Sequence, residues 1–288
     1  MLVVTKPKLG DSPMTTLDFI TQLFCRVDDK MTSVSKHSQA NLYPSEVVTL
    51  GILFALKGVG NRAFYRWLER DFKPLFPKLP ERSRLFRLLA THQDWTRHFL
   101  AEPTVLGVAD SYGIELVHPK REGRSKGQIG NAQRAPGKSN WRWIIGGKLG
   151  FVLNQFGLIV SWTCDTANVH DSAFHPLIAQ FVRPATDEQE ATVDMIVLTD
   201  TGFHAKEGDP INMKICPRGS WNVRMLVETV LSMLTTVCHL KKVGHRAWVY
   251  FGARLAFVMA AFNLCATWHG LVPDEDGFIR LSIAEFSL

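Results

Sequence analysis

Three carboxylates have the residue type and the setting that metal chemistry requires. Asp110 and Asp200 each end a short apolar run, and Glu228 lies within 223–234, where apolar residues recur at helical spacing. Carboxylates that converge from two strand ends and one helix form an oxygen-rich site suited to Mg²⁺ or Mn²⁺. This pattern points to metal-assisted phosphoryl transfer.

Strands are expected to position the two aspartates. After Pro103 the pattern changes from helical to strand-like, and Asn154-Gln-Phe-Gly157 has the length and the glycine of a hairpin turn. The predicted order is strands at 104–117, 143–153 and 157–163, a helix at 171–181, strands at 195–199 and 211–216, and a helix at 223–240. This is the order of an RNase H-like mixed sheet flanked by helices, so the predicted fold class is α/β.

The region in front of the sheet is expected to be entirely helical. Helices are predicted behind Ser12-Pro13, from Ser45 to the residue before Gly58, at 61–71 and at 81–100. The second and third of these would be joined by Gly58-Val-Gly60. Two helices joined by a short glycine turn form either a DNA-binding helix-turn-helix or a pair in a packed bundle, and the sequence leaves both interpretations open.

Composition favours a protein with a large core, and its positive balance of charge fits either a polyanionic partner or ordinary surface chemistry. The chain has 288 residues, 46% of them apolar, and a net charge of +6 with a pI near 9.1. Its five cysteines form no metal-binding or disulfide pattern, which indicates a reducing compartment and a cytoplasmic protein. The amino terminus lacks the layout of an export signal. The apolar run 255–268 is too short to cross a membrane and is expected to be a buried helix, part of a closing segment at 246–268.

Residues 118–142 carry the clearest local excess of positive charge. The segment is polar and rich in glycine, so we expect a long exposed loop after the first strand. Trp141 is expected to be exposed, where an indole can stack on an unpaired base, whereas Trp143 is expected to face the core. The basic residues predicted to bind DNA phosphates are Lys120, Arg121, Arg124, Lys126, Arg134, Lys138 and Arg142.

Five motifs surround the three acids in a fixed order. They are V-A-D-S-Y with Asp110, H-P-K-R at 118–121, N-V-H-D at 168–171, L-T-D-T-G-F with Asp200, and V-E-T-V-L-S-M-L with Glu228. Together they resemble the DDE transposases of bacterial insertion sequences, which belong to the retroviral integrase superfamily. The helical front region also looks like the amino-terminal part of such transposases, so the resemblance covers most of the chain.

The resemblance implies a complete reaction. Asp110, Asp200 and Glu228 would hold two Mg²⁺ ions, which Mn²⁺ can replace, and the protein would cut DNA at the ends of an insertion sequence and join them to target DNA. Its partners would be double-stranded DNA, namely terminal inverted repeats and target, and further copies of the chain in a homodimer or larger oligomer. It would act in the bacterial cytoplasm, associated with the nucleoid when bound to DNA. The implied segments are a DNA-end-binding and assembly region at 1–103, a catalytic domain at 104–240 and a helical extension at 241–288.

The helix around the third acid matches the family only in part. Some members carry Y-x2-R-x3-E-x6-K, and the corresponding residues here are Trp221, Arg224, Glu228 and Thr235. Arg224 keeps a phosphate-binding role, whereas the lysine is absent and Lys241 or Lys242 would have to replace it. Without the resemblance, Arg224 and Glu228 would be read as a surface ion pair.

The role of His170 and the activity of the whole protein each have more than one interpretation. His170 is either a ligand of the scissile phosphate or a cap of the helix that follows it. The protein as a whole is a transposase, a DNA-binding descendant of a transposase without catalysis, or an RNase H-like nuclease. The order of the five motifs favours the transposase.

Overall fold

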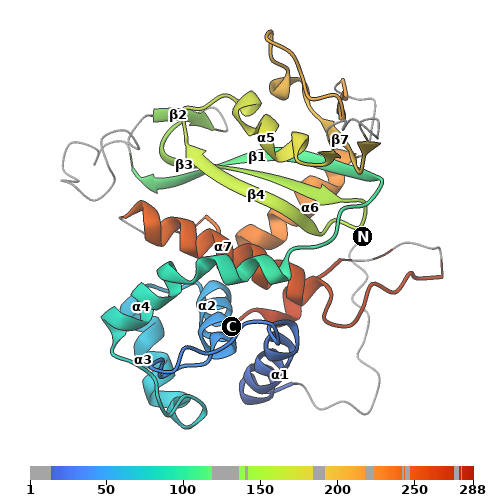
Figure 1. Cartoon of the computed structure of the whole chain (residues 1–288). Coiled ribbons are helices and arrows are strands. Elements are labelled where there is room, and N and C mark those ends of the chain that lie inside the picture. Colours follow the sequence, from blue (N-terminus) through green and yellow to red (C-terminus); the bar gives the residue numbers. More distant parts are fainter. Residues whose placement is uncertain are drawn as a thin grey trace.

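The helices and the sheet of this protein form two halves that share a helix, α7. The structure is a computed structural model. It describes residues 14–118, 136–139, 142–183, 192–217, 223–241, 243, 247–275, 279 and 281–288, with backbone only at 136–139, 142, 223 and 224. In Figure 1 the amino-terminal helices fill one half and the sheet the other, and α7 lies between them.

The first half consists of helices, as the sequence predicts. The elements are α1 (Thr16–Lys30), α2 (Pro44–Lys57), α3 (Asn61–Asp71), α4 (Arg82–Thr91) and the 3₁₀ segments η1 (Lys73–Leu75) and η2 (Gln93–Phe99). Thr15 caps α1, because its hydroxyl accepts from the Asp18 backbone N–H at 3.1 Å. Gly58 ends α2 in the left-handed conformation with φ of 63°, which a residue without Cβ adopts at low cost. The single helix predicted at 81–100 is divided in the structure into two elements, α4 and η2.

Helix α7 (Trp248–Ala266) is the predicted buried helix. With 19 residues it is longer than the run 255–268, so the prediction that this segment is too short to cross a membrane is wrong, whereas the prediction of a buried helix is confirmed because most of α7 is buried inside the protein. Two polar side chains within it are satisfied by backbone groups of other elements. Arg254 donates to the carbonyl oxygens of Phe54 and Ala55 in the last turn of α2, and Asn263 donates to those of Phe99 and Ile159.

The second half is built on a six-stranded mixed sheet. Its strands are β1 (Leu106–Val117), β2 (Pro136–Ser139), β3 (Arg142–Asn154), β4 (Ile159–Thr166), β7 (Ile196–Thr199) and β8 (Met213–Ile215). They are ordered β2-β3-β1-β7-β8, and β4 also pairs with β3. Strand β1 pairs with β3 antiparallel and with β7 parallel, and β7 pairs with β8 parallel. A separate two-stranded sheet joins β5 (Val182–Arg183) and β6 (Thr192–Val193).

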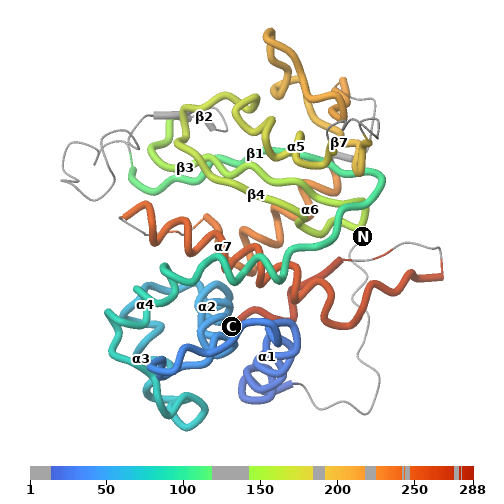
Figure 2. The backbone as a smooth tube through the Cα atoms, viewed as in Figure 1, coloured from blue at the N-terminus to red at the C-terminus, as the bar shows by residue number. Residues whose placement is uncertain are grey.

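Helices cover both faces of the main sheet. Helix α7 and α6 (Val223–Thr236) lie on one face, and the 3₁₀ turn η5 (Asp171–Phe174) with the short α5 (His175–Ala179) lies on the other (Figure 1). Two further 3₁₀ turns are η6 (Thr201–Phe203) and η7 (Ala284–Phe286). The backbone enters the sheet after η2 and returns to the helical half through α7 (Figure 2). The α/β class with a mixed, helix-flanked sheet is confirmed.

Several boundaries differ from the prediction. The expected loop at 118–142 includes β2 and the first residue of β3, because the backbone at 136–139 satisfies the edge of β3 at 142–145. The expected helix at 171–181 is a 3₁₀ turn followed by a five-residue helix with Pro176 in its first turn. The expected strand at 211–216 is only three residues long, Met213–Ile215.

Candidate functional site

The parallel pairing of β1 with β7 places the two predicted aspartates next to each other in register. Leu106 pairs with Ile196 and Val108 with Leu198. Continued two residues further along both strands, this register pairs Asp110 with Asp200, which follows the last residue of β7. Asp110 therefore lies within β1, and Asp200 lies just past the end of the neighbouring strand β7, as the N-cap of the 3₁₀ turn that follows.

Alternation along β1 decides which face each side chain occupies. Val108 and Tyr112 pack against the core cluster that contains α6 and α7, whereas Ala109 packs in the cluster on the α5 side. Successive side chains of a strand point to opposite faces, so Asp110 is directed toward the α6 side and Ser111 toward the α5 side. Helix α6 buries Val227 and Val230 and leaves Glu228 exposed, on the same side of the sheet as Asp110.

Asp171 is a neighbour of these aspartates that the sequence did not single out for the site. Its Oδ1 accepts a hydrogen bond from the Ser111 hydroxyl at 2.5 Å and lies 2.7 Å from the Lys148 ammonium. Lys148 also donates to the Val169 carbonyl at 3.0 Å. The backbone N–H of Ser111 donates to Asp110 Oδ1 at 2.7 Å. Ser111 therefore contacts both carboxylates, one through its backbone and one through its side chain.

Asp171 also approaches Asp200. A Cβ added at Gly202 would lie 2.9 Å from Asp171 Oδ2 and 3.0 Å from Asp200 Oδ1. The backbone N–H of Gly202 donates to Asp200 Oδ1 at 2.9 Å. Glycine at this position lets both carboxylates approach the same point, and Asp171 thereby connects the surroundings of Asp110 with those of Asp200.

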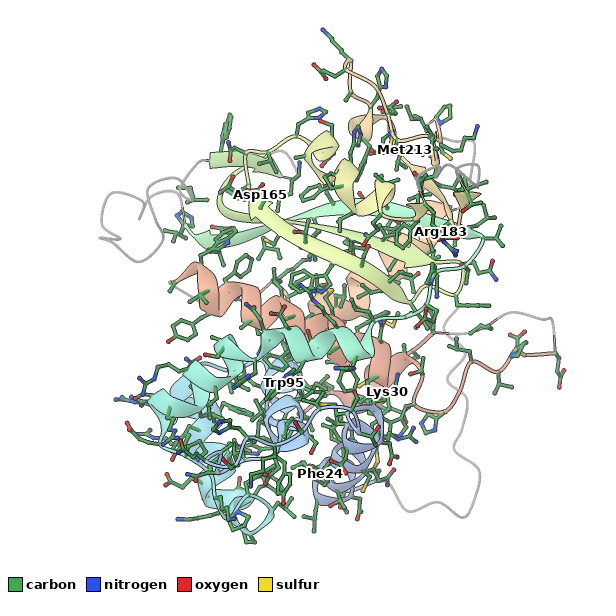
Figure 3. The ribbon with its side chains drawn as sticks, in the orientation of Figure 1. Phe24, Lys30, Trp95, Asp165, Arg183 and Met213 are labelled. Atoms are coloured by element: carbon green, nitrogen blue, oxygen red, sulfur yellow. The ribbon has the colours of Figure 1, made fainter. Side chains whose placement is uncertain are left out.

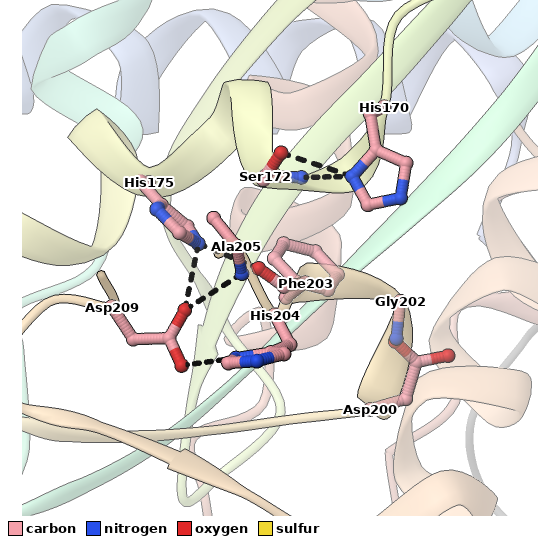
Figure 4. Close-up of polar contacts among 9 residues, drawn as sticks. All are labelled: His170, Ser172, His175, Asp200, Gly202, Phe203, His204, Ala205 and Asp209. Atoms are coloured by element: carbon pink, nitrogen blue, oxygen red, sulfur yellow. Dashed lines mark hydrogen bonds and ion pairs between the residues drawn. The ribbon is translucent and has the colours of Figure 1, made fainter. Parts of the chain in front are cut away.

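The loop after Asp200 is held by an aspartate and two histidines (Figure 4). Asp209 Oδ1 accepts from the Ala205 backbone N–H at 2.9 Å, and Asp209 Oδ2 lies 2.7 Å from His204 Nδ1. His175 Nε2 donates to the Phe203 carbonyl at 2.6 Å. The Ala205 N–H, followed by the His204 ring, lowers the pKa of the Asp209 carboxyl below its usual value. His204 is thus an exposed residue with a structural partner.

His170 has the geometry of a cap. Its Nδ1 accepts from the Ser172 backbone N–H at 3.3 Å and lies 2.9 Å from the Ser172 hydroxyl (Figure 4). The capping interpretation is confirmed, and contact of its exposed ring with DNA remains a prediction.

The other predicted DNA contacts are described only in part. Lys241 is exposed just beyond α6. Lys138, Arg142 and Arg224 lie in β2, β3 and α6, where only their backbone is described. Outside the described residues lie Lys120, Arg121, Arg124, Lys126, Arg134, Trp141 and Lys242.

The prediction that Trp143 faces the core is wrong. Its side chain is 63% exposed, while that of the next residue, Ile144, is 2% exposed. Ile145, which alternation places on the same face as Trp143, is 1% exposed, so the exposure of Trp143 reflects its place at the start of β3 (Arg142–Asn154) and not its face of the sheet.

A second basic region lies on α3 and α4. Residues 57–87 contain nine Lys or Arg and three Asp or Glu, an excess of six that equals the net charge of the whole chain. Arg62 and Arg66 of α3 are exposed one turn apart, and Arg84 and Arg87 of α4 are exposed as well. In the sequence, DNA-end binding by 1–103 is implied by the resemblance and by the helix-turn-helix alternative, whereas a running count of charge along the chain indicates this basic region directly.

The donor chemistry fits Mg²⁺, but the described geometry does not complete a cage. Asp110, Asp200 and Glu228 would offer carboxylate oxygens, the ligands that Mg²⁺ prefers. Within the part of the chain that the structure describes, no three His, Cys, Asp or Glu side chains are arranged to hold a metal ion.

Comparisons with known proteins identify no relative of this chain. No protein-family model matches the chain, and neither a curated protein nor a solved structure matches it.

Proposed function

We propose that the protein is a DNA transposase that cuts at the ends of an insertion sequence and joins those ends to target DNA. The observation that carries the proposal is the register of β1 and β7, which runs to Val108 and Leu198 and, continued by two residues, would bring Asp110 opposite Asp200. Glu228 lies on α6, the helix that packs on the same face of the sheet as Val108. The strand order β4-β3-β1-β7-β8 supports an RNase H-like sheet.

Asp110, Asp200 and Glu228 would hold two divalent ions. When bound, such ions activate the attacking oxygen and stabilise the leaving oxygen of a phosphodiester. The protein's own part is to fix the three carboxylates and to place DNA phosphates against them. Arg224, four residues before Glu228 on α6, is one turn away on the same side of the helix and would bind a phosphate there.

Helices α2 and α3 would bind the ends of the element. They meet at 115° and are joined by Gly58-Val-Gly60, which is the geometry of a helix-turn-helix. Helix α2 is buried along nearly its whole length, whereas α3 buries Phe64 and Leu68 and exposes its arginines. This difference in burial suits a helix-turn-helix in which α2 packs in the core and supports α3, and in which α3 enters the major groove of DNA.

Replacement of each acid tests the catalytic proposal. The substrate is a duplex that contains the DNA flanking the gene on both sides, incubated with Mg²⁺ and analysed for nicks and joined products. We expect wild type to cut and join. Asp110→Asn, Asp200→Asn and Glu228→Gln should each lower cleavage by several orders of magnitude, while binding of the duplex stays within about threefold of wild type. Chelation by EDTA should abolish cleavage, and Mg²⁺ or Mn²⁺ should restore it.

Each alternative function gives a different result in this assay. Binding without Mg²⁺-dependent nicking by wild type would identify a DNA-binding descendant that does not catalyse. Degradation of DNA or RNA without joined products would identify a nuclease. Cleavage retained by one of the three variants would remove that residue from the proposed site.

A further inference from the structure

Asp171 contacts the strand that carries Asp110 from the face of the sheet opposite to α6. One of its oxygens, Oδ1, receives the Ser111 hydroxyl at 2.5 Å and the Lys148 ammonium at 2.7 Å. Both charged side chains of this ion pair are largely buried, with exposed fractions of 18% for Lys148 and 24% for Asp171. Charge-assisted hydrogen bonds in such a setting are short and directional, so they fix the position of Ser111.

The position of Ser111 matters because its backbone N–H binds the neighbouring carboxylate. That N–H donates to Asp110 Oδ1 at 2.7 Å. On the other side, Asp171 Oδ2 and Asp200 Oδ1 flank the same point above Gly202, at 2.9 and 3.0 Å. The path Asp110–Ser111–Asp171 therefore ends beside Asp200.

Lys148 explains why a third aspartate is tolerated here. Three carboxylates near one another repel, and an ammonium in contact with one of them cancels its charge. Lys148 is held in this place by the Val169 carbonyl as well as by Asp171. Asp171 can thus act as a hydrogen-bond acceptor without adding net negative charge to the pair Asp110 and Asp200.

We propose that Asp171 is a positioning residue, which fixes Ser111, and through it the Asp110 carboxylate, relative to Asp200. The inference rests on the proposed function for its purpose, because the relative placement of Asp110 and Asp200 matters only if they share a metal. Outer partners of metal ligands typically change metal affinity or activity about 10- to 100-fold when they are removed.

The test is a double-mutant cycle on Ser111 and Asp171, with Mg²⁺ as the titrated ligand. We expect Ser111→Ala and Asp171→Ala each to raise the Mg²⁺ concentration for half-maximal binding about tenfold. Because both substitutions break one path, the double variant should be no worse than the worse single variant. Asp171→Asn should restore most of the affinity, since its amide oxygen still accepts from the Ser111 hydroxyl.

Asp165→Asn is the matched control. Asp165 lies opposite Lys148 in the β3–β4 ladder, is exposed near the end of β4 (Figure 3), and its carboxylate accepts only from the next residue's N–H among the described residues. Its removal should leave the Mg²⁺ affinity unchanged. Thermal unfolding of all variants shows that they are folded, since loss of folded protein lowers the amplitude of binding without shifting its midpoint.

Mg²⁺ binding is measured by calorimetry on the protein alone, and DNA cleavage is measured separately. If wild type binds Mg²⁺ but does not cut, the proposed function fails and the positioning role is still decided by the cycle. The inference is overturned if Asp171→Ala leaves the midpoint unchanged, if the two single effects multiply in the double variant, if Asp171→Asn is as impaired as Asp171→Ala, or if wild type binds no Mg²⁺.

Discussion

Asp209 shows how one carboxylate stabilises the loop that follows Asp200. It accepts from the Ala205 N–H and contacts the His204 ring, and both interactions favour its ionised form. The loop begins at Asp200, whose side-chain Oδ1 accepts a hydrogen bond from the backbone N–H of Gly202 two residues later. Order in this loop therefore contributes to order at the proposed metal site.

The pH dependence of this contribution follows from the lowered pKa of Asp209. A carboxyl whose pKa is lower in the folded state stabilises the fold fully above its unfolded pKa, near 3.9, and loses that contribution as pH falls through the folded pKa. Asp209→Asn should therefore unfold at a lower denaturant concentration than wild type at pH 7. The difference should shrink as pH falls below about 4. A difference that stays constant from pH 7 to pH 3 would contradict this cause.

The role of a residue can be predicted from the sequence where the residues next to it form a recognisable pattern. Asp110 and Asp200 each follow an apolar run, and the structure places Asp110 within β1 and Asp200 directly after β7, two strands that pair in parallel. Asp171 is predictable only as the start of a helix, because its partner Ser111 is 60 residues away and no local pattern indicates that contact. The cap formed by His170 is one of two interpretations that the sequence leaves open, since a ring nitrogen can serve either role.

At the scale of elements, α3 offers the clearest test of DNA binding. Its exposed arginines differ in how their charge is compensated. Arg70 makes two hydrogen bonds to Asp71, at 2.6 and 2.7 Å, which compensate its charge. Arg62 and Arg66 are exposed on the same side of the helix and lie within the basic region 57–87. They are the residues of α3 best placed to contact phosphates or base edges.

The double variant Arg62→Ala/Arg66→Ala should bind duplex DNA more weakly than wild type. If both side chains contact phosphates, the slope of log K against log salt concentration should become less steep by roughly two, about 0.9 for each phosphate that is no longer neutralised. Fluorescence anisotropy with a labelled duplex, measured from low to physiological salt, gives both quantities. A parallel titration with a random duplex shows whether sequence recognition is lost as well.

A second double variant controls for the general loss of charge. Arg97→Ala/Arg183→Ala removes two exposed arginines from η2 and β5, each paired with an aspartate at the surface. Such pairs contribute little to stability, so this variant should fold and bind DNA like wild type. Equal weakening by the two double variants, or wild-type binding by the α3 variant, would show that α3 is not the DNA-binding helix.

Elements are predictable in proportion to their length. Helices α2 and α3 and the long strands β1 and β3 have enough residues for periodicity to appear, and their bounds agree with the prediction within a few residues. Strand β2 escapes prediction because glycine, proline and basic residues dominate 118–142, and only the edge of β3 makes a strand there favourable. The short α5 is overestimated in length, because the helical period continues past its end into Phe181, which is buried beyond the helix.

The whole molecule is held by a core that crosses the predicted segment boundaries. One cluster of buried residues contains Leu23 and Leu53 of the helical half, Phe151 and Ile159 of the sheet, and Phe257 of α7. A second, smaller cluster lies between the other face of the sheet and α5. The division into segments at 1–103, 104–240 and 241–288 remains a prediction about roles. Packing joins all three through α7.

This shared core predicts that both halves unfold together. Arg254 and Asn263 of α7 each bind backbone carbonyls of the helical half, and Asn263 also binds Ile159 of β4. Separation of the halves would leave these buried polar groups without partners and would expose the apolar surface of α7, so it should require nearly the full free energy of unfolding. Native-state hydrogen exchange, followed by mass spectrometry at increasing denaturant, should therefore give the same opening free energy for peptides from α2 and from β3. Markedly earlier exchange of α2 would show that the helical half opens on its own.

Replacement of Asn263 by Ala provides the complementary measurement, because it should lower both opening free energies by an equal amount, of the order of 1–3 kcal/mol. A decrease confined to one half would contradict a single cooperative unit.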